Sequence, residues 1–182
     1  MDIEVLKNRV YTTRKSRINT SERLIKKEKF IQGINIYYSC VLIAVSIFGL
    51  NNQSYMMSLL SVIASISLTM SLLYISNQRY SERAQELKNN YICLQELYFK
   101  LEELNNETKD LSAFEQQYIE LLHSSENHSE MDYIKAQMTL KKASWKEKCK
   151  YYFITFLLLL IKLLIIVAPI IFILLTIRFI NT

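Results

Sequence analysis

Glycine and proline are nearly missing from this chain, which has two glycines and one proline among its 182 residues. Both residues favour turns and disfavour helix interiors, so their scarcity predicts long helices with few tight turns. The three cysteines, Cys40, Cys93 and Cys149, have neither paired nor metal-type spacing. Such spacing gives no sign of a disulfide framework or a zinc site. The sequence predicts an all-α protein without a metal or cofactor.

Motifs of catalytic sites are also missing. The sequence has no glycine-rich phosphate loop and no serine–histidine–aspartate order, and its two histidines, His123 and His128, are five residues apart. That spacing does not match the i, i+4 pair that binds a metal from one helix face. We therefore predict that the protein is not an enzyme, and that the histidines have capping and hydrogen-bonding roles in a loop.

Three long apolar runs dominate what is present: 34–50, 55–75 and 151–177. They contain 17, 21 and 27 residues, and about 17–25 helical residues cross a bilayer. Lys162 is the one acidic or basic residue within them. The sequence predicts an all-α integral membrane protein: a transmembrane helical hairpin, a cytoplasmic helical bundle or coiled-coil-like segment, and a third, C-terminal transmembrane helix.

Charge outside the runs predicts the topology. Residues 1–33 contain nine lysines and arginines against four acidic residues, whereas the link 51–54 is uncharged. By the positive-inside rule, the N-terminus is cytoplasmic in a multi-pass inner (plasma) membrane protein. Basic residues next to a membrane also favour anionic lipid over nucleic acid as the partner. The expected organisation is a basic N-terminal helix at 1–33, a hairpin at 34–76, a cytoplasmic helical region at 77–150 and the third transmembrane helix at 151–180.

Helix boundaries follow from breakers and periodicity. The first helix, over 3–30, is expected to end near Gly33, and the second run is expected to continue into the cytoplasm as one long helix. That continuation carries a heptad seam: Leu87, Tyr91, Leu94, Tyr98 and Leu101.

Two capping boxes predict further helix starts. Ser112-x-x-Glu115 is expected to begin one helix, and Ser129-x-x-Asp132 a second. The second of these helices is expected to run through Trp145 into the third apolar run.

A stripe of hydroxyl-bearing side chains marks the second run. On a helical wheel, seven residues fall within an arc of about 80°, and six of them are serine or threonine. These seven are Ser54, Ser58, Ser61, Ser65, Thr69, Leu72 and Ser76. Weaker stripes mark the first run (Asn35, Ser39, Ser46, Gly49) and, every seven residues, the third (Thr155, Lys162, Pro169, Thr176). Two interpretations stay open: close packing of helices through small and hydroxyl side chains, or a hydrated path enclosed by several copies.

Lys162 lies near the middle of the third run, where lysine costs roughly 2.5–3.5 kcal/mol on insertion scales. The apolar neighbours, at about −0.3 to −0.6 kcal/mol each, outweigh this cost. Lys162 either extends along a tilted helix to the membrane surface or faces the interior of an oligomer. Pro169, two turns further on, is expected to free a backbone carbonyl and to bend the same face.

Two groups of residues resemble a known family. The stretch 14–24 and Tyr37-Tyr38-Ser39 are similar to the start of SLATT domains, the SMODS and SLOG-associating two-transmembrane effector domains. Glu126-Asn127-His128 followed by Asp132-Tyr133 is similar to the signature of their fifth subfamily. The matching positions are Arg14, Arg17, Glu22, Arg23, Asn127, His128, Asp132 and Tyr133. We expect these side chains to make polar contacts between the N-terminal helix and the cytoplasmic bundle.

The resemblance implies a prokaryotic membrane effector of conflict systems that a partner sensor switches on and that damages the host membrane, often through pores. It implies nucleotide-signalling enzymes or reverse transcriptases as partner systems. Direct nucleic-acid binding is not expected, because the basic excess lies next to the membrane. The third apolar run departs from the two spans of the family name. The leading hypothesis is a homo-oligomeric, pore-forming or membrane-disrupting effector in antiviral defence. The alternatives are a non-conducting anchor that recruits a cytoplasmic partner through residues 79–148, and a holin-like permeabilising protein.

Overall fold

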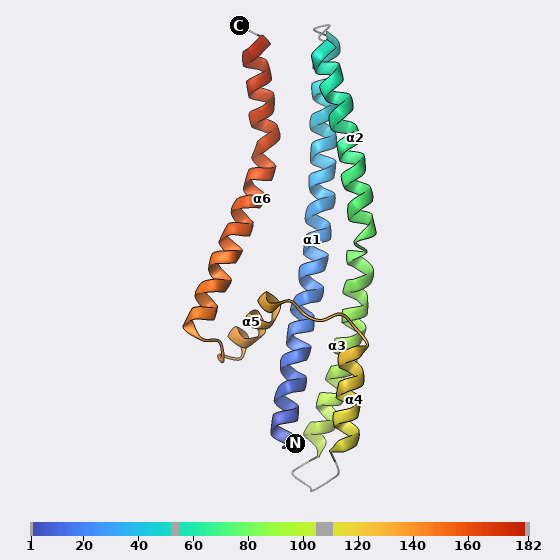
Figure 1. The fold of residues 1–182 in the computed structure, drawn as a ribbon, viewed down its shortest axis with the longest axis vertical. Coiled ribbons are helices and arrows are strands. Elements are labelled where there is room, and N and C mark those ends of the chain that lie inside the picture. Colours follow the sequence, from blue (N-terminus) through green and yellow to red (C-terminus); the bar gives the residue numbers. More distant parts are fainter. Residues whose placement is uncertain (1, 52–54, 105–110, 181–182) are drawn as a thin grey trace. The chain divides into compact units, whose positions relative to one another are not determined.

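The computed structural model describes residues 2–51, 55–104 and 111–180, and all regular structure within these ranges is helical (Figure 1). The helices are α1 (Ile3–Asn51), α2 (Tyr55–Asn77), α3 (Tyr80–Glu103), α4 (Ser112–His123), α5 (Glu130–Thr139) and α6 (Trp145–Ile180). Three stretches, Ile3–Ile47, Ser58–Glu103 and Trp145–Ile171, contain windows long and apolar enough to cross a membrane. The predicted all-α membrane fold is confirmed.

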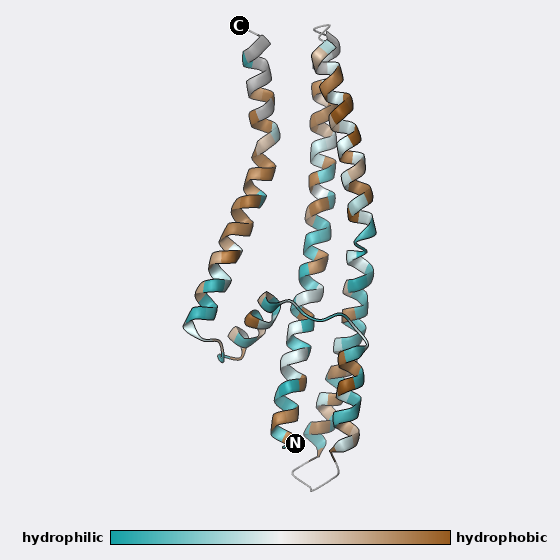
Figure 2. Ribbon diagram, in the orientation of Figure 1, coloured by the Kyte–Doolittle hydropathy of each residue, from teal (hydrophilic) through white to brown (hydrophobic). Residues whose placement is uncertain are grey.

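The helices divide into two compact units, each described here by itself. The bundle unit contains Met1–Lys26 and Tyr80–Phe153, and the apolar unit contains Lys27–Arg79 and Ile154–Thr182. Figure 2 shows the difference in composition, because apolar residues predominate along α6 whereas polar and apolar residues alternate along α3.

The bundle unit has a core between α1 and α3. Leu6 and Val10 of α1 pack with Leu94, Leu97 and Leu101 of α3, and all five side chains are fully buried. Aromatic and aliphatic residues of α4 cover this cluster. Burying one such side chain contributes about 1.5–3 kcal/mol, so this cluster fixes α1 on α3. It includes two leucines of the predicted heptad seam.

Two helix boundaries differ from expectation. α1 continues through Gly33 to Asn51, so the predicted end near Gly33 is wrong. A glycine costs a helix only about 0.5–1 kcal/mol relative to alanine, and the apolar residues that follow Gly33 continue the helix. The predicted long helix from the second run is interrupted instead at Gln78 and Arg79. Their amides bond carbonyls three residues back, and Arg79 has a φ of 46°.

The predicted caps have mixed outcomes. Ser129 caps α5 as expected, because its hydroxyl accepts from the amide of Asp132 at 3.3 Å. Ser112 is not a cap: Leu111 occupies that position and makes no side-chain capping bond.

The predicted continuous helix into the third run is also wrong, because α5 ends at Thr139. Lys141 (φ 57°) and the bonds Lys141 N to Met138 O and Lys142 N to Gln137 O form a Schellman motif. A separate helix, α6, then begins at Trp145.

Candidate functional site

A buried carboxylate, Asp132, joins α5 to α1 in the bundle unit. The side chain is 5% exposed and lies in the first turn of α5. Arg23 Nε donates to both carboxylate oxygens, at 3.1 and 2.9 Å. The hydroxyls of Thr20 and Ser129 donate to Oδ2 at 3.0 and 2.7 Å. Because burying a charge is costly unless it is paired and hydrogen-bonded, these donors are what allow the carboxylate to be inside.

The same contacts set the charge state of Asp132. Burial raises the pKa of this carboxyl, but hydrogen bonds from Arg23, Ser129 and Thr20 and the Arg23 charge together lower it more, so the pKa lies below its usual value. Asp132 is therefore ionised at neutral pH and holds α5 to α1 as an anion.

Arg17 makes a second link, between α1 and the end of α4. Its side chain is 1% exposed, and its guanidinium donates to the carbonyls of Leu121 at 2.8 Å and Leu122 at 3.1 Å. It also donates to the amide oxygen of Asn90 on α3. A cation suits the C-terminal carbonyls of a helix, which carry partial negative charge. Burial lowers the pKa of Arg17.

Small polar residues of α1 extend these contacts. Asn19 donates to the backbone carbonyl of Asp132 at 3.1 Å, and Ser21 donates to the carbonyl of Ala84 at 2.9 Å. The Thr13 hydroxyl lies 2.8 Å from the Tyr118 phenol. Sequence reasoning did not single these residues out. A signal was present, because Thr13, Ser16, Thr20 and Ser21 recur at helical spacing beside Arg17.

The family-motif positions thus have different surroundings. The structure brings Arg17, Arg23 and Asp132 into contacts between α1 and the other helices. The Arg14 guanidinium lies 4.9 Å from the Tyr11 ring centroid on its own helix and 5.9 Å from the Tyr98 ring centroid on α3.

The remaining motif positions lie on α1, on α5 and in the segment that joins α4 to α5. Glu22 is exposed and pairs with Lys26 at 3.8 Å, also within α1. His128 stacks on Tyr133 with ring centroids 5.7 Å apart. Asn127 is exposed, and its side chain accepts from the His128 amide.

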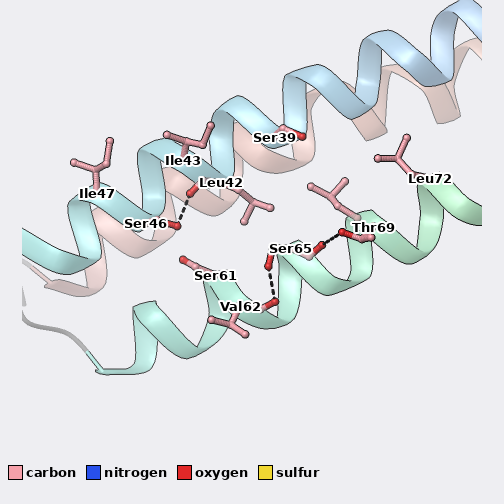
Figure 3. Close-up of a pocket in the computed structure, with 11 residues that line it drawn as sticks. Ser39, Leu42, Ile43, Ser46, Ile47, Ser61, Val62, Ser65, Thr69 and Leu72 are labelled. Carbon is pink, nitrogen blue, oxygen red and sulfur yellow. Dashed lines mark hydrogen bonds between the residues drawn. The ribbon is translucent and has the colours of Figure 1, made fainter.

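The apolar unit contains an open groove of about 480 Å³ between α1 and α2 (Figure 3). Ser39 and Ser46 of α1 and Ser61, Ser65 and Thr69 of α2 line it, together with aliphatic side chains. Parts of the two predicted stripes therefore share one groove.

Hydroxyls in this groove bond mainly along their own helices. Ser39 donates to the carbonyl of Asn35, Ser46 to Leu42 and Thr69 to Ser65, four residues back in each case. Such bonds satisfy a hydroxyl in an apolar surrounding without a second helix. The side chains of Ser65 and Thr69 are exposed in the single chain, so the groove is open along α2.

Other stripe positions lie elsewhere. Ser58 and Ser76 of α2 and Thr155 and Lys162 of α6 are exposed, and Pro169 is buried. None of these residues lines the groove. Ser54 and the side chain of Thr176 lie outside the described residues.

Pro169 determines how α6 contacts α1. Proline has no backbone N–H, so the carbonyl of Ile165, four residues earlier, lacks its helical partner. The Tyr38 phenol of α1 donates to this carbonyl at 2.8 Å, and Tyr37 donates to the carbonyl of Ile166 at 3.2 Å. An unsatisfied carbonyl costs several kcal/mol in hydrocarbon. Tyr38 therefore compensates for the bond that Pro169 removes.

Lys162 contacts α1 nearer to its basic end. Its Nζ atom lies 5.0 Å from the ring centroid of Phe30, which precedes the first apolar run. Lysine side chains on a helix point toward its N-terminus, and a cation over an aromatic face is attracted to it. This contact favours a lysine that extends along the helix over one that faces an oligomer interior.

Three long apolar helical stretches, in which only 6% of each window is buried, together with a compact bundle, define an all-α membrane protein. The chain belongs to the SMODS and SLOG-associating 2TM effector domain family 5, whose match covers residues 1–180. No curated protein and no solved structure matches the chain. The family description names two transmembrane helices, and α6 is a third helix apolar enough to cross a membrane.

Proposed function

We propose that this protein permeabilises a prokaryotic inner membrane when a partner sensor activates it, as the effector of an antiviral, abortive-infection system. The family description supports an effector role and an association with SMODS and SLOG proteins. The nine cations of residues 1–33 favour a cytoplasmic N-terminus. The bundle unit is then the part that receives the sensor's signal, and the effector acts without catalysis.

The observation that carries the proposal is the open, hydroxyl-lined groove between α1 and α2. A single chain leaves Ser65 and Thr69 exposed in a groove whose remaining lining is aliphatic apart from three serines. Small and hydroxyl residues at such positions allow helices to approach closely in lipid. Several copies that turn these grooves toward a common axis would line a path with hydroxyls rather than with aliphatic groups.

Dye release from liposomes tests conduction. Full-length protein is reconstituted at fixed density, with and without a SMODS or SLOG protein from the same genome as activator. Ser61→Leu with Ser65→Leu is expected to reduce the leak by at least about tenfold, because leucine in a narrow path favours dewetting. Ser67→Leu with Ser71→Leu is the matched control, since Ser67 and Ser71 lie in the same helix and do not line the groove. Absence of any leak, or equal leaks from the two double variants, contradicts conduction through the groove.

A second candidate function is a non-conducting membrane anchor that recruits a partner through the bundle unit. It is favoured by the hydroxyl bonds within single helices, which need no water or second copy. The test replaces the apolar segments with unrelated ones of equal length in cells that contain the sensor. Retained protection against phage supports the anchor, and lost protection with a correctly inserted chimera supports permeation.

A further inference from the structure

A polar groove of about 430 Å³ lies in the bundle unit. Its walls come from the first turns of α1, from Tyr118 of α4, from Tyr133 and Gln137 of α5, and from Lys142, which follows α5. The volume falls within the range of about 300–1,000 Å³ that is usual for small-molecule sites. None of the contacts described for Arg17 or Asp132 uses its basic residues.

Charge in this groove has one sign. Arg9 and Lys142 are cationic, and none of the nine lining residues is acidic. Arg9 is exposed, and no hydrogen bond or ion pair joins it to another residue within 2–51, 55–104 and 111–180. Lys142 donates to the amide oxygen of Asn8 at 3.1 Å, which is a neutral partner. Two cations without a carboxylate between them favour an anion.

Neutral side chains of the groove are held in place by bonds to one another. Gln137 donates to the phenol oxygen of Tyr133 at 2.8 Å, and the Tyr133 ring stacks on His128. The Tyr118 phenol is bonded to Thr13. The aromatic wall of the groove is thus positioned before a ligand arrives, which lowers the entropic cost of binding.

We propose that this groove binds a phosphorylated small molecule, with Arg9 and Lys142 contacting the phosphate and the two tyrosines contacting the rest of the ligand. The phosphate belongs either to a soluble, nucleotide-sized compound or to a lipid headgroup, and both present the same anion. The groove has two cations among nine lining residues, which suits one small anionic ligand better than a nucleic-acid chain with many phosphates. The site stands whether or not the apolar unit conducts.

The test uses the full-length protein in phosphatidylcholine nanodiscs, titrated with ATP and with inorganic phosphate. Calorimetry and the unfolding temperature are expected to show saturable binding of ATP. The double substitution Arg9→Gln with Lys142→Gln is expected to weaken it at least about tenfold. The matched control is Lys88→Gln with Lys100→Gln, two exposed cations of α3 outside the groove. Both variants should unfold at the wild-type temperature without ligand, because all four side chains are exposed.

Nanodiscs that contain phosphatidylglycerol distinguish the two phosphate sources. If a headgroup occupies the groove, these discs raise the unfolding temperature of the wild type but not of the Arg9→Gln, Lys142→Gln variant. The proposal is overturned if neither ATP, phosphate nor phosphatidylglycerol gives saturable binding. Equal binding by that variant and by the wild type overturns it as well. Neither result depends on dye release, so failure here is separate from failure of the proposed permeation.

Discussion

The bundle unit and the apolar unit use their polar side chains in opposite ways. In the bundle unit Arg17 and Asp132 are buried and bond residues more than 70 positions away in the chain. In the apolar unit Ser46 and Thr69 bond carbonyls of their own helices. Long-range bonds specify one arrangement of helices, whereas local bonds leave the arrangement open. The long-range bonds therefore define the packing of the bundle unit, and the hydroxyl bonds of Ser46 and Thr69 do not define the packing of the apolar unit.

Tyr37 and Tyr38 are exceptions in the apolar unit, because each donates to a carbonyl of α6. Tyr38 is the informative one, since its acceptor, the Ile165 carbonyl, is the one whose local bond Pro169 removes. Where a helix satisfies its own carbonyls, a hydroxyl donor from another helix adds little stability in lipid. Where proline removes the N–H, a donor from another helix satisfies the free carbonyl, and this gain outweighs the entropy lost when the donor side chain is ordered.

Substitution of Arg17 by methionine is the strongest way to break the bundle unit. It leaves the Leu122 carbonyl and the amide oxygen of Asn90 without their Arg17 donor, whereas the Leu121 carbonyl keeps donors from Asn90 and Ser124. Each of these two buried acceptors costs about 1–3 kcal/mol when it is left unsatisfied. Hydrogen exchange of the α3 and α4 amides in the full chain should show opening that is easier by about 2–6 kcal/mol.

Lys88→Met is the matched control, because Lys88 is exposed on α3. It should change exchange by no more than about 0.5 kcal/mol. If the Arg17 and Lys88 variants exchange alike, the buried network is not what holds the bundle unit together.

Acid should weaken the bundle unit in two separate steps. Burial and the Arg17 charge lower the pKa of His128, although Asp132 raises it. Folding therefore favours neutral His128, and stability falls as the pH drops below about 6.5. The pKa of Asp132 is also low in the folded protein. Its contribution is complete above about pH 4 and is lost as the pH falls through the folded pKa.

Unfolding temperatures measured from neutral to acidic pH separate the two steps. His128→Gln should remove the upper step and keep the lower one. Asp132→Asn should remove the lower step and cost about 1.5–3 kcal/mol at neutral pH, toward the lower end because the Arg23 side chain is 45% exposed. A wild-type profile that is flat down to pH 4 would contradict the assignment of the upper step to His128.

The all-α membrane fold could be predicted from the sequence because hydropathy and helix propensity are local properties. The three apolar runs and the absence of breakers were enough for the all-α membrane fold. Two breaks were missed for one physical reason: Arg79 and Lys141 have left-handed φ angles of 46° and 57°, which glycine usually provides. A chain with two glycines gives no such signal at these positions.

The start of α6 was missed although its signal was present. Ser144-x-x-Glu147 is a capping box, in which the Glu147 carboxylate accepts from the Ser144 amide at 2.7 Å and the Ser144 hydroxyl accepts from the Glu147 amide at 3.3 Å. The partners of Arg17 belong to a different class, because Leu121 is 104 positions away. Periodicity places Arg17 on a helix, and only tertiary packing chooses which carbonyls it meets.

The smallest expected effect concerns the hydrogen bond from Tyr38 to α6 beside Pro169. A double-mutant cycle of these two residues measures it. Tyr38→Phe removes the donor to the Ile165 carbonyl, and hydrogen bonds between helices in membranes contribute about 0.6–1.7 kcal/mol. Pro169→Ala restores an N–H that bonds the same carbonyl within α6. In that background Tyr38→Phe should cost much less, as measured by unfolding in mixed detergent micelles, with exposed Tyr74→Phe as control. Equal costs of Tyr38→Phe with proline and with alanine at 169 would show that the phenol does not compensate for the missing N–H. The contact between Tyr38 and α6 would then have to be explained by packing alone.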